Sequence, residues 1–140
     1  MNNLHSVTSN AVAQLVNCST TERQIGTYLG RPHFEKVVSV TVPDYTGAEV
    51  QLYIEPQIPE TIAVTSFDGV YIKGDLDSYD FIMHIPYTYI NANDASRYLN
   101  IYIYFDANTQ RFPVSLGGTK ASGYYKNGHI YLTMRYIKLH

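Results

Sequence analysis

The sequence predicts a mainly β protein, in which a short N-terminal α-helix precedes an antiparallel β-sandwich or jelly-roll-like head. Near the N-terminus, apolar residues recur at steps of three and four. Further along, they alternate with polar residues in about seven or eight short segments. Only 16% of the residues are charged, whereas 14% are aromatic, and 14 residues are tyrosines. Tyrosine favours strands, and the low charge excludes a coiled coil or a disordered chain.

The helix is expected over roughly residues 4–17, where Thr8, Ser9 and Asn10 offer an N-cap oxygen. Isolated helices shorter than about 12–15 residues are marginal in water, because too few hydrogen bonds offset the cost of nucleation. The apolar stripe must therefore pack either on its own domain or against copies of itself from other chains. The residues that would form such an oligomeric seam are Leu4, Val7, Ala11 and Leu15.

The strands are expected from residue 34 onwards, where the apolar period becomes two. The clearest alternation covers residues 38–42, 50–54, 62–64, 99–105 and 130–136. Residues 70–72 add a short strand, and residues 79–85 are apolar enough to be buried on both faces. We therefore divide the chain into an N-terminal helical stem and connector, residues 1–33, and a β-sandwich head, residues 34–140.

Turn signals separate these strands. Asp68-Gly69 and Asn127-Gly128 are dipeptides that suit turns with positive φ, since glycine carries no Cβ and Asp or Asn tolerates that region. A further strand is expected over residues 111–116, but Pro113 lacks a backbone N–H and so confines it to a sheet edge or a bulge.

The charge and cysteine content exclude several classes of protein. Ten basic residues against 12 acidic ones give a formal net charge of -2, which argues against nucleic-acid binding and against polybasic membrane association. No apolar run reaches the roughly 20 residues of a membrane-spanning helix. Cys18 is the only cysteine, so no disulfide can form within one chain, as is usual for a protein that folds in the reducing cytosol.

The sequence shows no catalytic constellation and no cofactor motif. Its histidines lack the spacing of metal ligands. Asp75, Asp77 and Asp80 are weak candidates for a metal site, because their run lacks the glycine and the distal glutamate of a helix-loop-helix calcium site, and a solvated acidic loop is favoured. Together with Glu55 and Glu60, these aspartates could also supply a carboxylate pair for glycan cleavage, which is the least favoured function.

Tyrosine placement is the feature with functional content. Tyr98, Tyr102 and Tyr104 alternate with apolar residues of their strand, and Tyr53 does the same on another strand. If the aliphatic residues face the core, these rings are exposed and offer a rigid amphipathic surface for proteins or for the apolar faces of sugars. Alternatively, the tyrosines only stabilise cross-strand pairs, or they form a subunit interface.

Two phrases near the N-terminus resemble those of bacteriophage and prophage tail-fibre or appendage proteins. Residues 6–13, Ser-Val-Thr-Ser-Asn-Ala-Val-Ala, resemble a phrase that opens a short helix in those proteins. Residues 25–37 are similar to the family's "IGTW-x-GKP-x-Y-x-KV" phrase, with Tyr28 for tryptophan, Arg31 for lysine and Phe34 for tyrosine. The closing residues 135–138, Arg-Tyr-Ile-Lys, look like the family's terminal Tyr-x-Lys strand. Residues 43–128 carry no such phrase.

The resemblance implies a structural, non-enzymatic subunit of a phage particle, made in the bacterial cytoplasm and assembled into the virion as a fibre, tail-tip or head-fibre component. Such proteins are commonly homotrimers with a β-domain that touches the host surface. The implied partners are other copies of the chain, other virion proteins and a host-surface glycan or protein. A carbohydrate-binding module is the alternative function, since exposed tyrosines stack on sugars.

Overall fold

The computed structural model describes residues 20–75, 77–94 and 96–139, and over these residues the chain forms two antiparallel sheets and no helix. The larger sheet has the order β1-β2-β9-β4-β5, made of β1 (Arg23–Tyr28), β2 (Arg31–Thr41), β9 (His129–Lys138), β4 (Ile62–Asp75) and β5 (Ser78–Ile85). The smaller sheet has the order β3-β8-β7-β6, made of β3 (Glu49–Ile54), β8 (Phe112–Gly118), β7 (Tyr98–Ile103) and β6 (Tyr87–Ile90).

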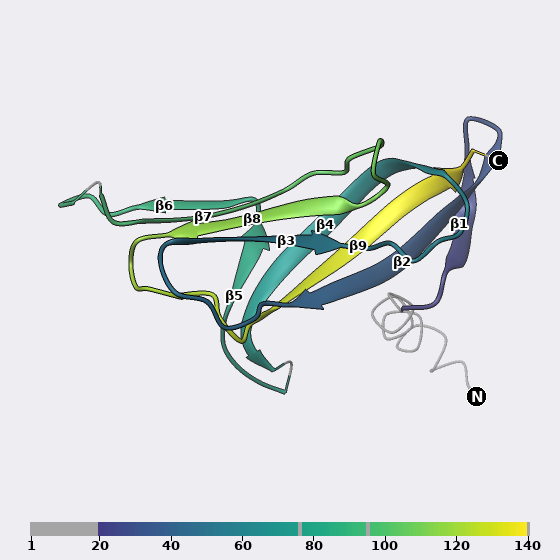
Figure 1. Cartoon of the computed structure of the whole chain (residues 1–140). Helices are drawn as coiled ribbons and strands as arrows, with labels where there is room; N and C mark the ends of the chain where they lie inside the picture. Colours follow the sequence, from purple (N-terminus) through teal and green to yellow (C-terminus); the bar gives the residue numbers. More distant parts are fainter. Residues whose placement is uncertain (1–19, 76, 95, 140) are drawn as a thin grey trace.

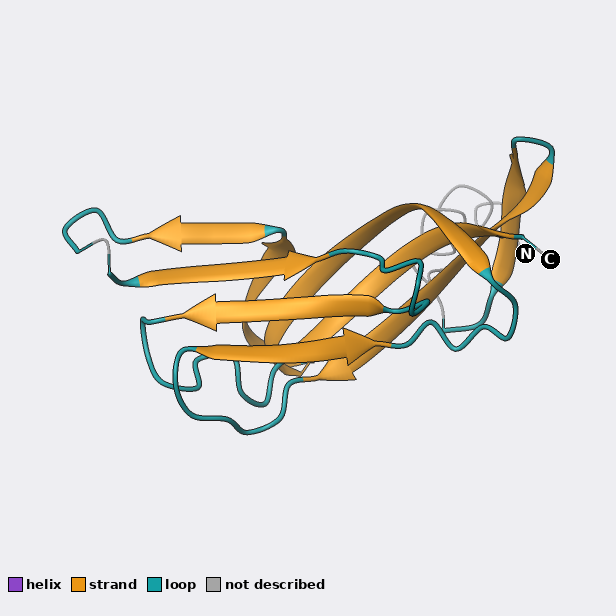
Figure 2. Ribbon diagram, turned by 45° about the horizontal axis from the view of Figure 1, so that its top comes forward, coloured by secondary structure: helices purple, strands orange, loops and turns teal. Residues whose placement is uncertain are grey.

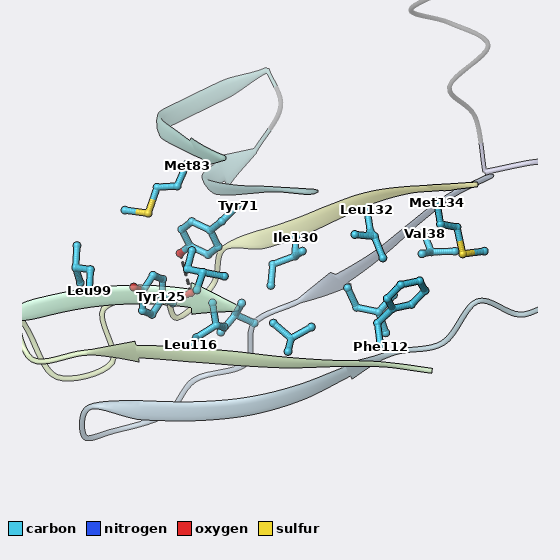
Figure 3. Close-up of a cluster of buried hydrophobic side chains, with 14 of the residues drawn as sticks. Val38, Tyr71, Met83, Leu99, Phe112, Leu116, Tyr125, Ile130, Leu132 and Met134 are labelled. Atoms are coloured by element: carbon cyan, nitrogen blue, oxygen red, sulfur yellow. Dashed lines mark hydrogen bonds between the residues drawn. The ribbon is translucent and has the colours of Figure 1, made fainter. Parts of the chain in front are cut away.

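The two sheets lie in separate layers and share one hydrophobic core (Figures 1 and 2). β9 shows why the sequence folds this way, because its alternate residues Ile130, Leu132, Met134 and Tyr136 are all fully buried. Figure 3 shows Ile130, Leu132 and Met134 on the side of β9 that faces the smaller sheet, where they meet apolar residues such as Phe112. The prediction of a mainly β, antiparallel, two-sheet protein is confirmed. The chain passes between the sheets from β2 to β3, from β3 to β4, from β5 to β6 and from β8 to β9.

The expected N-terminal helix lies outside the described residues. So do Cys18 and the oligomeric seam of Leu4, Val7, Ala11 and Leu15. The larger sheet begins at Arg23, ahead of the alternation expected from residue 34, because β1 pairs with β2 in a hairpin that turns at Leu29 and Gly30. Both turn residues have positive φ, 51° and 78°.

The predicted turn at Asp68-Gly69 is wrong. These residues lie inside β4, which runs without a break through both of the segments expected on either side of them. β4 pairs with β9 on one side and with β5 on the other, and these pairings keep Asp68 and Gly69 extended. Gly69 is buried because the side chains of Ile85 and Leu132 lie over it, each with an atom 3.4 Å from where a Cβ would be.

Two other strand predictions are also wrong. The segment 79–85, expected to be buried on both faces, is the edge strand β5, in which only Met83 is buried. Pro113 lies in β8, which is flanked by β3 and β7 and is not an edge. Its carbonyl accepts a hydrogen bond from Tyr104 N–H at 3.5 Å, so its ring nitrogen also faces the β7 side, beyond the last β7 pair, Ile103 with Val114. Pro113 therefore cannot return a hydrogen bond to Tyr104, and the regular β7–β8 pairing ends one residue earlier, at Ile103 and Val114.

The two ends of the described chain meet at β1, β2 and β9. Glu35, which is 7% exposed, accepts hydrogen bonds from Arg23 at 3.0 Å and from Arg135 at 3.1 Å. Lys138 donates to Glu22 at 2.9 Å, and the Tyr136 hydroxyl also donates to Glu22. Burial would raise the pKa of Glu22, but the hydrogen bonds from Lys138 and Tyr136 together lower it.

A pair of buried tyrosines links the two sheets. The Tyr71 hydroxyl on β4 donates to the Tyr125 carbonyl at 2.8 Å, and the Tyr125 hydroxyl donates to the Gly117 carbonyl on β8 at 2.9 Å. Their rings meet edge to face, with centroids 5.2 Å apart. The predicted turn before β9 is present, since Asn127 has φ of 62°, and Gly128 lies directly under the ring of Tyr71.

We expect Gly128→Ala to lower the free energy of unfolding by about 2–3 kcal/mol, because the new Cβ would overlap Tyr71, whose ring is fully buried and hydrogen-bonded in place. Gly69→Ala is the matched control, since its Cβ would meet only ordinary contacts at 3.4 Å. Urea denaturation measures both. Equal losses for the two variants would contradict the tight contact between Gly128 and Tyr71.

Candidate ligand-binding face

The outer face of the smaller sheet gathers three exposed tyrosines. Tyr53 on β3 pairs with Pro113 on β8, and Tyr102 on β7 pairs with Ser115 on β8. Tyr104 follows β7 and donates its N–H to the Pro113 carbonyl. Because directly paired residues point to the same side of a sheet, these five residues share one surface, which we call the tyrosine face. Tyr53, Tyr102 and Tyr104 are 46%, 48% and 60% exposed.

Neighbouring side chains hold two of these rings in place. The guanidinium of Arg111 lies over the Tyr53 ring, 3.7 Å from its centroid, and also pairs with Glu55 at 3.7 Å. The Tyr102 hydroxyl and the Thr88 hydroxyl of β6 are 3.2 Å apart and form a hydrogen bond. Rings fixed in this way lose little conformational entropy when they bind a ligand.

Tyr98, the fourth tyrosine predicted for this surface, lies at the opposite end of β7 from Tyr104. It follows the same alternation as Tyr102 but is only partly exposed, and it pairs with Ile90 on β6. The structure therefore brings Tyr53, Tyr102 and Tyr104 together through β8 and leaves Tyr98 at the margin. Arg111 was not predicted as part of this surface, because no local pattern shows that it lies over a ring of another strand.

The three acidic candidates lie at the β4–β5 hairpin, and the side chain of Asp75 lies outside the described part of the structure. Asp75 ends β4, and Asp77 and Asp80 are exposed at the hairpin that leads into β5 and along that strand. No group of three or more His, Cys, Asp or Glu side chains among the described residues is placed to hold a metal ion.

Glu55 and Glu60 line one open cavity of about 340 Å³ near Gln110, away from the acidic hairpin in sequence and on a different connection. Each carboxylate already contacts a cation, Glu55 through Arg111 at 3.7 Å and Glu60 through Lys138 at 3.5 Å. The two glutamates therefore line one cavity, and each lies within ion-pair distance of a cation.

Comparison of the chain with protein-family models, curated proteins and solved structures finds no match. Among the described residues, no helix has the length and hydropathy needed to span a bilayer.

The tyrosines of the core differ sharply from those of the tyrosine face. Tyr71, Tyr125 and Tyr136 are fully buried, and burial raises the pKa of all three hydroxyls well above the usual 10. For Tyr136, the hydrogen bond to the Glu22 carboxylate raises the pKa further. These three rings, the buried tyrosines, keep their protons and are closed to reagents in the folded protein.

We therefore expect tetranitromethane at pH 8 to nitrate the three tyrosines of the tyrosine face and to spare the buried tyrosines, because the reagent needs an accessible ring that can ionise. Peptide mapping by mass spectrometry measures the yield at each position. Tyr28, 43% exposed on the β1–β2 hairpin, is an internal positive control. Protection of the tyrosine face while Tyr28 reacts would instead place that face in a subunit interface.

Proposed function

We propose that the chain is a non-enzymatic structural and adhesive subunit of a phage particle, which binds a host-surface component through the tyrosine face. The observation that carries this proposal is the grouping of three exposed rings around Pro113 and Ser115 on one sheet surface. Tyrosine gives a large contact area at small entropic cost, which suits adhesion. The scattered exposure of single apolar residues needs no explanation, but a group of rings indicates a binding surface.

The resemblance to phage appendage proteins supplies the biological setting of the proposal. The two resembling segments of the described chain, residues 25–37 and 135–138, are far apart in sequence but are adjacent in the sheet as β1, β2 and β9. Phe34 and Tyr136 stack with centroids 5.8 Å apart, and Glu35 pairs with Arg135. Segments that pack together in this way form one structural unit, which supports treating them as one motif.

The proposal places the described sheets as the head and the preceding residues as a stem that joins three copies in the virion. The stem rests on the spacing of Leu4, Val7, Ala11 and Leu15, because a short apolar stripe gains stability when copies bury it together. The head would then present the tyrosine face outwards to the host.

We expect the double variant Tyr102→Ala/Tyr104→Ala to lose at least about tenfold of the affinity of the fluorescently labelled protein for the surface of its host bacterium, because interface aromatics carry much of the binding energy. Flow cytometry measures binding, and Tyr28→Ala is the control because Tyr28 is similarly exposed but belongs to the other sheet. Unchanged binding by the double variant would reject the tyrosine face as the adhesive surface.

A glycan array distinguishes the alternative function, a carbohydrate-binding module that uses the same rings. Saturable signals lost in the double variant would identify a sugar as the host component. Cell binding with a silent array would identify a protein.

We expect light scattering at micromolar concentration to give the mass of a trimer, about three times the 15.9 kDa of one chain, and expect Val7→Asp/Ala11→Asp to dissociate it. Two buried aspartates would put uncompensated charges into the seam. Ala13→Asp is the control, since helical spacing puts Ala13 on the side opposite the apolar stripe. A monomeric wild-type protein would contradict the proposed trimeric stem, but it would not bear on the proposed role of the tyrosine face.

A further inference from the structure

A second candidate binding surface lies on the side of the smaller sheet opposite the tyrosine face. The β6–β7 hairpin extends past the end of the larger sheet, as Figures 1 and 2 show, so part of its inner surface has no strand opposite it. Tyr89 shows the effect, because it pairs with Leu99 and points to the same side, yet Leu99 is 3% exposed and Tyr89 is 42% exposed. The inner face of the smaller sheet is therefore buried at Leu99 and open to solvent at Tyr89.

This surface forms a groove of about 370 Å³ between the two sheets. A volume of this size falls within the range of about 300–1,000 Å³ typical of small-ligand pockets. β5 contributes Phe81 and Met83, and β6 contributes Tyr87 and Tyr89. The connection from β8 to β9 closes the groove with Tyr124 and Lys120. We call these six residues the aromatic groove.

The wall of the aromatic groove is held rigidly. Phe81 and Tyr124 stack with centroids 6.0 Å apart and an interplanar angle of 25°. Tyr124 also meets Tyr125, the ring that links the sheets, edge to face at 5.2 Å. Lys73 donates to the carbonyls of Tyr124 at 3.0 Å and Lys126 at 2.8 Å, which fixes the backbone of this connection. A ligand would therefore meet preformed ring faces and would spend little free energy on ordering them.

The charge of the groove selects the kind of ligand. The ammonium of Lys120 lies 5.4 Å from the centroid of the Tyr124 ring, at the mouth of the groove. Among the residues that the structure describes, no aspartate or glutamate lines the groove. Its polar groups are the Lys120 ammonium and the hydroxyls of Tyr87, Tyr89 and Tyr124. The arrangement suits a ring with an apolar face, hydroxyls on its edge and one negative charge.

We propose that the aromatic groove binds an acidic sugar, a hexuronic acid unit of a polysaccharide. The C–H face of the sugar would stack on the exposed ring of Tyr89, the tyrosine hydroxyls would bond its hydroxyl groups, and Lys120 would pair with its carboxylate. The groove lies on the opposite side of the sheet from the tyrosine face, so this site does not depend on the proposed adhesive surface. Either site can fail its test without the other.

Methionine methyl groups provide a direct probe of the groove. The chain has three methionines, of which Met83 lines the groove, Met134 lies in the core and Met1 begins the chain. Figure 3 shows Met83 and Met134 at opposite ends of the buried cluster. With ¹³C-methyl methionine in the full chain, we expect trigalacturonic acid to shift the Met83 signal saturably and to leave the Met134 signal in place. Met83→Leu assigns the signal.

Substitution of Lys120 tests the charge. We expect Lys120→Gln to weaken binding of trigalacturonic acid by about tenfold, since a charge-assisted hydrogen bond is lost, and to leave the weaker binding of neutral galactotriose unchanged. Lys126→Gln is the matched control, because Lys126 belongs to the same connection but does not line the groove. Tyr89→Ala should weaken both saccharides, because it removes a stacking face that is exposed and not part of the core.

Three results would overturn the proposal. The first is a Met83 signal that does not move with trigalacturonic acid at 10 mM. The second is equal affinity for the acidic and the neutral saccharide in the wild-type protein and in Lys120→Gln. The third is a Met83 shift with a tyrosine-rich peptide but not with either saccharide, which would assign the groove to a protein partner.

Discussion

Tyr125 is the residue on which the arrangement of the two sheets depends. It lies in the connection from β8 to β9, accepts a hydrogen bond from Tyr71 of the larger sheet and donates one to Gly117 of the smaller sheet. A buried hydroxyl without a partner costs about 1–3 kcal/mol, so both rings are confined to the positions that satisfy these bonds. Gly128 allows the chain to pass beneath Tyr71, where any side chain would overlap it. The spacing of the sheets at this point is therefore set by two rings and one glycine.

Beyond this link, the β6–β7 hairpin extends past the end of the larger sheet. On one side of the tyrosine pair the core is closed, with Ile130, Leu132 and Phe112 fully buried. On the other side lie Met83 and Leu99, and then the open surface of Tyr89. β7 keeps its inner face buried through Leu99 and Ile101. The edge strand β6 is accessible from both sides, since Tyr89 lines the aromatic groove and Thr88 bonds Tyr102 of the tyrosine face.

Alternation along single strands was predictable from the sequence, but the neighbours of each strand were not. In β3, β7 and β9 one face is more buried than the other, so period two identified these strands and the exposed side of Tyr53 and Tyr102. Whether Asp68-Gly69 turns or continues depends on distant pairing partners, Ile85 of β5 for Gly69 and Thr133 of β9 for Asp68. The apolar residues of β5 predict a strand buried on both faces, although β5 lies at an edge of the larger sheet. The stacking of Arg111 on Tyr53 and the aromatic groove likewise arise from strand order, which no local pattern contains.

The three positions where the chain departs from the phage appendage phrase make contacts that do not need the residue of the phrase. Phe34 uses only its ring, between Tyr136 and the ammonium of Lys138, 4.7 Å from its centroid, so the hydroxyl of a tyrosine is not needed there. Arg31 donates to the carbonyls of Lys138 and Leu139 at 3.2 and 3.3 Å, bonds that a lysine ammonium can also make. Tyr28 lies against His33 with centroids 5.2 Å apart, a contact open to any aromatic ring. Each departure thus keeps the interaction that its position makes with the rest of β1, β2 and β9. The three substitutions are therefore compatible with the proposed resemblance, because each contact depends on an aromatic ring or a cation and not on the particular residue of the phrase.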